Sequence, residues 1–148
     1  MPRTNSMNVP GALIALLLCS LTPAWAAAPG FQAELDPVAF TRATRDDVAG
    51  VGNVAGNLDG NTLVITGNFS DLSSPAKSAH LRIGLAMGVP GPAVAELAVT
   101  HEVSGVISGK VTLTDEQLAR LRRSAVYVQL ESVKAPEGNL WGWLEAAH

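Results

Sequence analysis

The feature that most restricts the fold is a pair of strand-like segments that meet at a tight turn. Residues 54–58 lead into Asp59-Gly60-Asn61, and residues 63–69 follow with the sequence LVITGNF. An Asp-Gly pair between two such segments is a favoured hairpin turn, because glycine adopts positive φ without a steric penalty. The chain is therefore expected to contain an antiparallel β-hairpin centred on Gly60.

Alternation of apolar and polar residues predicts further strands on both sides of this hairpin. Residues 79–83 place alternate apolar side chains on one face, and residues 125–131 do the same. The other expected strands are 31–35, 93–100, 103–113 and 140–144. Residues 36–52 are expected to form a long connection. Residues 88–92 are expected to be irregular, because their two prolines lack the N–H groups that a strand ladder needs.

A capping box predicts one short helix over residues 114–123. Thr114 can accept a hydrogen bond from the amide of Gln117, whose side chain can bond back to the amide of Thr114. Leu118 and Leu121 then share one side of the helix. Seven or eight strands with one helix favour an all-β, antiparallel, Greek-key-like fold, either a β-sandwich or a flattened barrel.

The N-terminus has the layout of a secretory signal peptide. Arg3 supplies a positive charge, residues 11–19 are almost entirely apolar, and Ala24-Trp25-Ala26 offers a cleavage pattern of small residues. The apolar stretch is shorter than the ~20 residues that span a bilayer. We therefore expect residues 1–26 to be removed, residues 27–148 to form a single domain, and the mature protein to be periplasmic or secreted.

The charge of this domain bears on its partners, and its cysteine content bears on its disulfides. Loss of Arg3 with the signal leaves nine Lys and Arg against thirteen Asp and Glu, a net charge of −4. Nucleic-acid binding is not expected, because phosphate contacts need clustered basic side chains. The only cysteine, Cys19, lies in the predicted signal, so the mature domain has no disulfide. No transmembrane segment and no cofactor motif is recognised in residues 27–148.

Four segments of the sequence have a recognisable order and spacing. They are Phe31-Gln32-Ala33-Glu34-Leu35; Ala79-His80-Leu81-Arg82; Gly88-x-Pro90-Gly91-Pro92-Ala93-Val94-x-x-Leu97; and Leu113-Thr114-x-x-Gln117-x-x-x-Leu121 running into Tyr127-Val128-Gln129-Leu130 and Pro136-x-Gly138-Asn139-Leu140-x-Gly142-x-Leu144. In this order the sequence resembles the CHRD domain, a module first described in chordin and widespread in exported bacterial proteins. The resemblance implies an extracellular or periplasmic β-sandwich module, in a family most of whose members have no assigned activity.

The sequence departs from the family pattern where that pattern has histidines. His80-Leu81-Arg82 stands in place of His-x-His, Glu131 in place of another His, and Trp141 in place of an Arg. The resemblance implies that a site able to hold a metal in relatives is here reduced to one imidazole, one carboxylate and one guanidinium.

These departures fall on a candidate polar site. His80 and Arg82 share the polar face of their expected strand, and Tyr127 and Glu131 share that of residues 125–131. If the strands are neighbours, Glu131 can pair with either basic residue. One hypothesis is a remnant site for a small ligand, or for Cu or Zn through His80 and Glu131. The preferred hypothesis is a solvent-facing salt bridge worth about 0–1 kcal/mol, because zinc prefers three or four ligands and Arg82 brings positive charge.

Trp141 and Trp143 form a second candidate surface. The two indoles lie on one face of the last expected strand, separated by Gly142. They form either an apolar patch for a partner or a sugar, or a cover for the sheet's open end or the underside of the 36–52 connection. The covering role is the preferred interpretation.

The leading functional prediction is an exported, non-enzymatic binding or structural module of the CHRD type. It has no cofactor, and its partner is an unknown protein or small ligand. The alternative is a periplasmic Cu or Zn protein that uses His80 and Glu131. Catalysis is not expected, because the sequence holds no recognisable nucleophile with its base and no paired acid and base.

Overall fold

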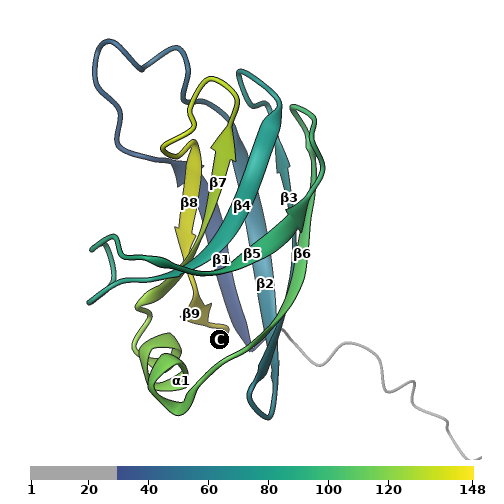
Figure 1. Ribbon diagram of the computed structural model, residues 1–148, viewed down its shortest axis with the longest axis vertical. Helices are drawn as coiled ribbons and strands as arrows, with labels where there is room; N and C mark the ends of the chain where they lie inside the picture. Colours follow the sequence, from purple (N-terminus) through teal and green to yellow (C-terminus); the bar gives the residue numbers. More distant parts are fainter. Residues whose placement is uncertain (1–29) are drawn as a thin grey trace, which may run out of the picture.

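The computed structural model describes residues 30–148, which form β-strands and one short helix (Figure 1). The strands are β1 (Phe31–Pro37), β2 (Val51–Asp59), β3 (Thr62–Ser70), β4 (Ala76–Ile83), β5 (Ala93–Val99), β6 (Gly105–Thr112), β7 (Val126–Ser132), β8 (Leu140–Trp143) and β9 (Glu145–Ala146), and the helix is α1 (Asp115–Arg122). The helix in this range, α1, is not long and apolar enough to cross a membrane. The predicted signal peptide, residues 1–26, lies outside the described residues.

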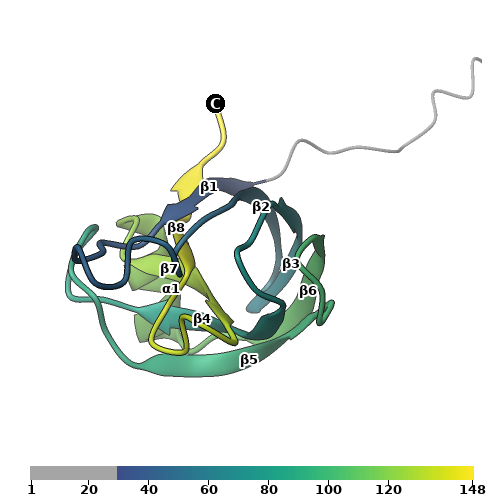
Figure 2. The same ribbon diagram turned by 90° about the horizontal axis from the view of Figure 1, so that it is seen from above.

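The sheet closes on itself as an eight-stranded antiparallel barrel. Its strands follow the order β1, β2, β3, β6, β5, β4, β7 and β8, and β8 pairs with β1 again. The view along the barrel shows these strands as a ring (Figure 2). The β4–β5–β6 meander is flanked by β3 beside β6 and by β7 beside β4, which is Greek-key connectivity. The predicted all-β fold is confirmed, and the barrel is the form that the chain adopts.

The predicted hairpin is formed by β2 and β3, and its strands extend beyond the residues 54–69 that the sequence pattern indicated. The pairing runs from Val51 opposite Ser70 to Asp59 opposite Thr62, which leaves a two-residue loop. Gly60, the first residue of this loop, has φ of 59°. Glycine at that position is what a type II′ turn requires, because a side chain there would be strained. The turn chemistry therefore sets the register of the longest strand pair.

Alternate side chains of every barrel strand fill the interior. Leu63, Ile65, Leu81, Val128 and Leu130 are all completely buried. The same cluster includes the two leucines of α1, which closes one end of the barrel (Figure 1). The predicted capping box starts this helix as expected from the sequence. The period-two pattern thus identified the core-facing side chains correctly.

The connection from β1 to β2, residues 38–50, projects from the other end of the barrel on the side of β7 and β8 (Figure 1). It is anchored by Asn139. The Asn139 side chain is fully buried. Its Nδ2 donates to the carbonyl of Ala49 at 2.8 Å, and its Oδ1 accepts from the Ala49 amide at 3.2 Å. The carbonyl of Asn139 also accepts from the amide of Val38 at 3.0 Å. One asparagine therefore holds both ends of the connection.

Replacing Asn139 with alanine is expected to lower the free energy of unfolding by about 2 kcal/mol. The substitution leaves the polar backbone groups of Ala49 without their partner. Urea denaturation followed by circular dichroism measures the change. Asn57→Ala, at an exposed position of β2, is the matched control and is expected to change stability by less than about 0.5 kcal/mol. Equal losses in both variants would show that the anchor contributes nothing.

Candidate functional site

The polar face of β7 is buried, contrary to the prediction that it faces solvent. Tyr127, Gln129 and Glu131 are 0%, 8% and 4% exposed. Side chains of β4 and β8 cover this face, together with the backbone of Gly91 and Glu137. Alternation separates the two faces of a strand, but it does not reveal what lies over the outer one. The interpretation of Glu131 as one half of a solvent-facing salt bridge is therefore wrong.

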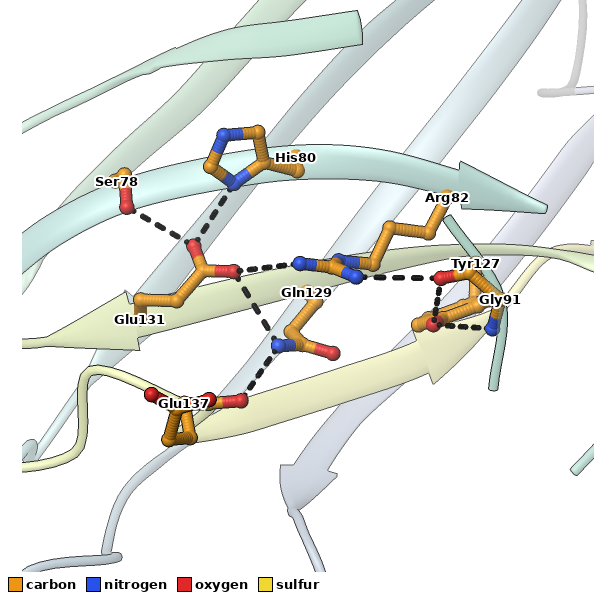
Figure 3. Close-up of polar contacts among 8 residues, drawn as sticks. All are labelled: Ser78, His80, Arg82, Gly91, Tyr127, Gln129, Glu131 and Glu137. Atoms are coloured by element: carbon orange, nitrogen blue, oxygen red, sulfur yellow. Dashed lines mark hydrogen bonds and ion pairs between the residues drawn. The ribbon is translucent and has the colours of Figure 1, made fainter. Parts of the chain in front are cut away.

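Strands β4 and β7 are neighbours, and their pairing brings the predicted site residues together. Arg82 lies opposite Tyr127, and Ser78 lies opposite Glu131. The Glu131 carboxylate is the centre of the resulting network (Figure 3). Its Oε2 accepts from Ser78 Oγ at 3.1 Å and lies 3.1 Å from His80 Nδ1. Its Oε1 accepts from Gln129 Nε2 at 3.3 Å and lies 3.7 Å from Nη2 of Arg82.

The network continues from Arg82 and Gln129 to the chain segments that cover β7 (Figure 3). Arg82 Nη1 donates to the carbonyl of Gly91 at 3.2 Å. The Tyr127 hydroxyl donates to the same carbonyl at 3.1 Å and accepts from the Gly91 amide at 3.0 Å. Gln129 Nε2 donates to the carbonyl of Glu137 at 3.0 Å. These bonds fix residues 84–92 and the turn before β8 against the barrel wall.

The carboxylate at the centre of this network is poorly suited to hold a metal. Both Glu131 oxygens already have partners, including the positively charged Arg82. A cation would have to displace these groups and would meet the guanidinium charge. His80, with 27% of its side chain exposed, is then the one remaining ligand of the predicted pair. In the described part of the chain, no three His, Cys, Asp or Glu residues are grouped as a metal site would require.

An open groove of about 540 Å³ lies beside the network on the outer face of β7 and β8. Arg82, Tyr127, Gln129 and Trp141 form its inner wall, and Lys134 contributes to its rim. The rest of its lining comes from residues 38–48, the segment 84–92 and the turn before β8, namely Val38, Ala39, Thr44, Asp47, Val48, Pro90, Ala135, Pro136, Glu137 and Gly138. Of the four residues predicted from sequence, Arg82 and Tyr127 line the groove, whereas His80 and Glu131 support it from behind.

The two tryptophans lie on the outer wall of the barrel and pack against Tyr127. The Trp143 ring centroid is 4.4 Å from that of Tyr127, and the Trp141 centroid is 5.9 Å from that of Trp143. The predicted cover for an open end of the sheet is wrong, because β8 pairs with β1 and the sheet closes. Trp141 does share its groove with Val38 of the 38–50 connection. Both indoles remain partly exposed.

Comparison with known proteins identifies the family. A family model described as the CHRD domain matches residues 31–144. The chain belongs to the CHRD domain family. No curated protein and no solved structure matches the chain. The CHRD match begins at the first residue of β1 and ends directly after β8, so the CHRD domain of this chain is the closed eight-stranded barrel.

Parts of three of the four segments that carry the CHRD resemblance meet at the groove. Residues 79–82 lie in β4, and the last segment supplies residues 127–130 in β7 and residues 136–144, which form the turn and β8. Residues 88–92 cover them through the Gly91 contacts to Tyr127. Sequence reasoning missed Ser78 and the anchoring role of Gly91. The signal for Gly91 was its place between two prolines, which excludes a regular strand and allows the backbone to face a side chain.

Proposed function

We propose that this CHRD protein is an exported, non-catalytic binding module that holds its ligand in the groove over β7 and β8. The observation that carries the proposal is the fixed inner wall of the groove. Arg82, Tyr127 and Gln129 are held by hydrogen bonds and an ion pair before any ligand arrives. A preorganised wall reduces the entropy that is lost on binding. The groove also combines apolar and polar lining, as ligand sites generally do.

Binding is favoured over catalysis because the carboxylate behind this wall is already occupied. The Glu131 carboxylate accepts from neutral donors and pairs with Arg82, so it is not available as a general base. Among the described residues that line the groove there is no serine, cysteine or histidine. The same occupancy disfavours the alternative of a Cu or Zn protein. The apolar signal-like segment at residues 11–19 supports export to the periplasm or beyond the cell.

The lining indicates the general chemistry of the ligand. Lys134 and Arg82 supply positive charge, Asp47 and Glu137 supply negative charge, and Trp141 supplies an aromatic face. Such a groove suits a ligand that carries both polar and apolar groups, either a small molecule or a side chain of a protein partner.

A ligand screen on the exported protein tests this proposal. All 148 residues are expressed in a Gram-negative host, and the protein is isolated from the periplasmic fraction with isotopic labelling. Amino acids, dipeptides and sugars are then screened by NMR. Hits are expected to shift the signals of Trp141 and Arg82 and to remain chemically unchanged over hours. Lys134→Ala is expected to weaken them about tenfold, as for one charge-assisted hydrogen bond.

The matched control is Lys110→Ala, at an exposed position of β6, which is expected to leave the affinity unchanged. Shifts confined to other faces of the barrel would refute the site. Conversion of a bound hit into a product would refute the non-catalytic role.

A further inference from the structure

A second groove, with a volume of about 640 Å³, lies on the outer wall where β8 and β9 run beside β1. Its charged lining residues are Glu34, Asp36 and Glu145, and all three are exposed. Among the described residues that line it there is no Lys, Arg or His. The remaining lining is Gln32, Ala33, Asn53, Val54, Ala55, Met87, Trp141, Gly142 and Trp143. The groove is therefore negatively charged and has aromatic walls.

The pairing of β1 with β8 and β9 places these carboxylates beside the indoles. Asp36 lies opposite Trp141, and Gln32 lies opposite Glu145. Strands β8 and β9 therefore pair with β1 in the same register. The same register places Glu34 opposite Trp143. Directly opposed side chains on one face have Cβ atoms about 4.5–5.5 Å apart. The wall thus repeats a pair made of one carboxylate and one indole.

A cationic group satisfies both members of such a pair at once. The face of an indole attracts a cation, most strongly for tryptophan, and the neighbouring carboxylate neutralises its charge. Three carboxylates without a basic neighbour repel one another, and a bound cation relieves that repulsion. Met87, which is 49% exposed, adds an apolar surface for the aliphatic part of a Lys or Arg side chain. A neutral sugar would stack on the indoles but leave the carboxylates uncompensated.

The spacing of the carboxylates indicates how the cations are linked. Glu34 and Asp36 are two residues apart on β1, which separates their Cα atoms by about 6.8 Å. Alternate side chains of an extended polypeptide have the same spacing. We propose that this groove binds an extended segment of a polypeptide partner with Lys or Arg at alternate positions. This site goes beyond the proposed function, because it is a different groove that shares only Trp141 with the first.

The test uses synthetic peptides and the purified protein in isothermal titration calorimetry at low salt. The probe is a capped glycine peptide with arginine at every second position, three in total. The reference ligands are a peptide of the same composition with three contiguous arginines, and free argininamide. The alternating peptide is expected to bind most tightly, to quench tryptophan fluorescence, and to weaken as salt is added.

A double substitution, Glu34→Gln with Asp36→Asn, is expected to weaken the alternating peptide about tenfold or more, as for the loss of two charge-assisted contacts. The matched control is Asp115→Asn with Glu116→Gln on α1, which removes the same charge from another exposed surface. Thermal melting confirms that both variants are folded. Equal weakening in both variants, no binding at all, or equal affinity for the contiguous peptide or argininamide would overturn the proposal.

Discussion

Replacing Glu131 with alanine is expected to lower the free energy of unfolding by about 3 kcal/mol. The substitution leaves the Arg82 guanidinium without its ionic partner, and removal of one member of a buried pair costs about 3–5 kcal/mol. The lower end applies because 27% of the Arg82 side chain is exposed. Ser78 and Gln129 lose an acceptor at the same time. Urea denaturation with an unchanged m-value measures the loss.

Two further variants separate the charge effect from a general loss of side-chain volume. Arg82→Met combined with Glu131→Leu is expected to be more stable than Glu131→Ala, because it leaves no unpaired charge. Glu102→Ala removes an exposed carboxylate and is expected to change stability by less than about 0.5 kcal/mol. A loss below about 1 kcal/mol in Glu131→Ala would place this network among ordinary surface ion pairs.

Replacing Gly142 with alanine is expected to open the seam where the barrel closes. A Cβ at this position would meet the carbonyl oxygen of Glu34 on β1 and would lie 2.8 Å from Cδ2 of Leu35. The backbone of β1 has to move away, because a carbonyl in a strand is not a flexible side-chain end. Overpacking of this kind costs about 1–3 kcal/mol, and the backbone contact places the cost near about 3 kcal/mol.

The strands in which amide hydrogen exchange increases distinguish a local opening from general destabilisation. Amide hydrogen exchange is expected to increase first in β1 and β8 and only later in β3 and β6. Gly30→Ala is the matched control, because its Cβ would make an ordinary contact of 3.7 Å with the carbonyl of Gly56. Uniform faster exchange throughout the barrel would contradict a local opening of the seam.

The parts of the fold that depend on local chemistry were predictable from the sequence. The turn at Gly60 and the capping box at Thr114 are encoded within a few residues, and the structure contains both. The alternation around Leu81 and Val128 identified the core faces of β4 and β7. It also placed His80 and Arg82 on the face that meets Glu131.

The parts that depend on distant segments were not predictable. Burial of Tyr127 requires the Gly91 segment and the β8 indoles to lie over β7. The choice of a barrel instead of a sandwich depends on β8 pairing with β1 from the opposite end of the domain. Asn139 finds Ala49 across 90 residues of chain. None of these contacts leaves a period or a turn signal in the sequence.

Closure of the ring also determines how this domain can meet another chain. Each of the eight ring strands has a neighbour on both sides, although β5 pairs with β6 only at Ala98 and Val99. Where a strand is paired on both sides, an incoming strand cannot extend the sheet, and the route by which exposed β-edges recruit peptides or aggregate is blocked. Recognition on this paired part of the wall therefore depends on side chains. Substitutions of these side chains can change the partner that binds without altering the fold.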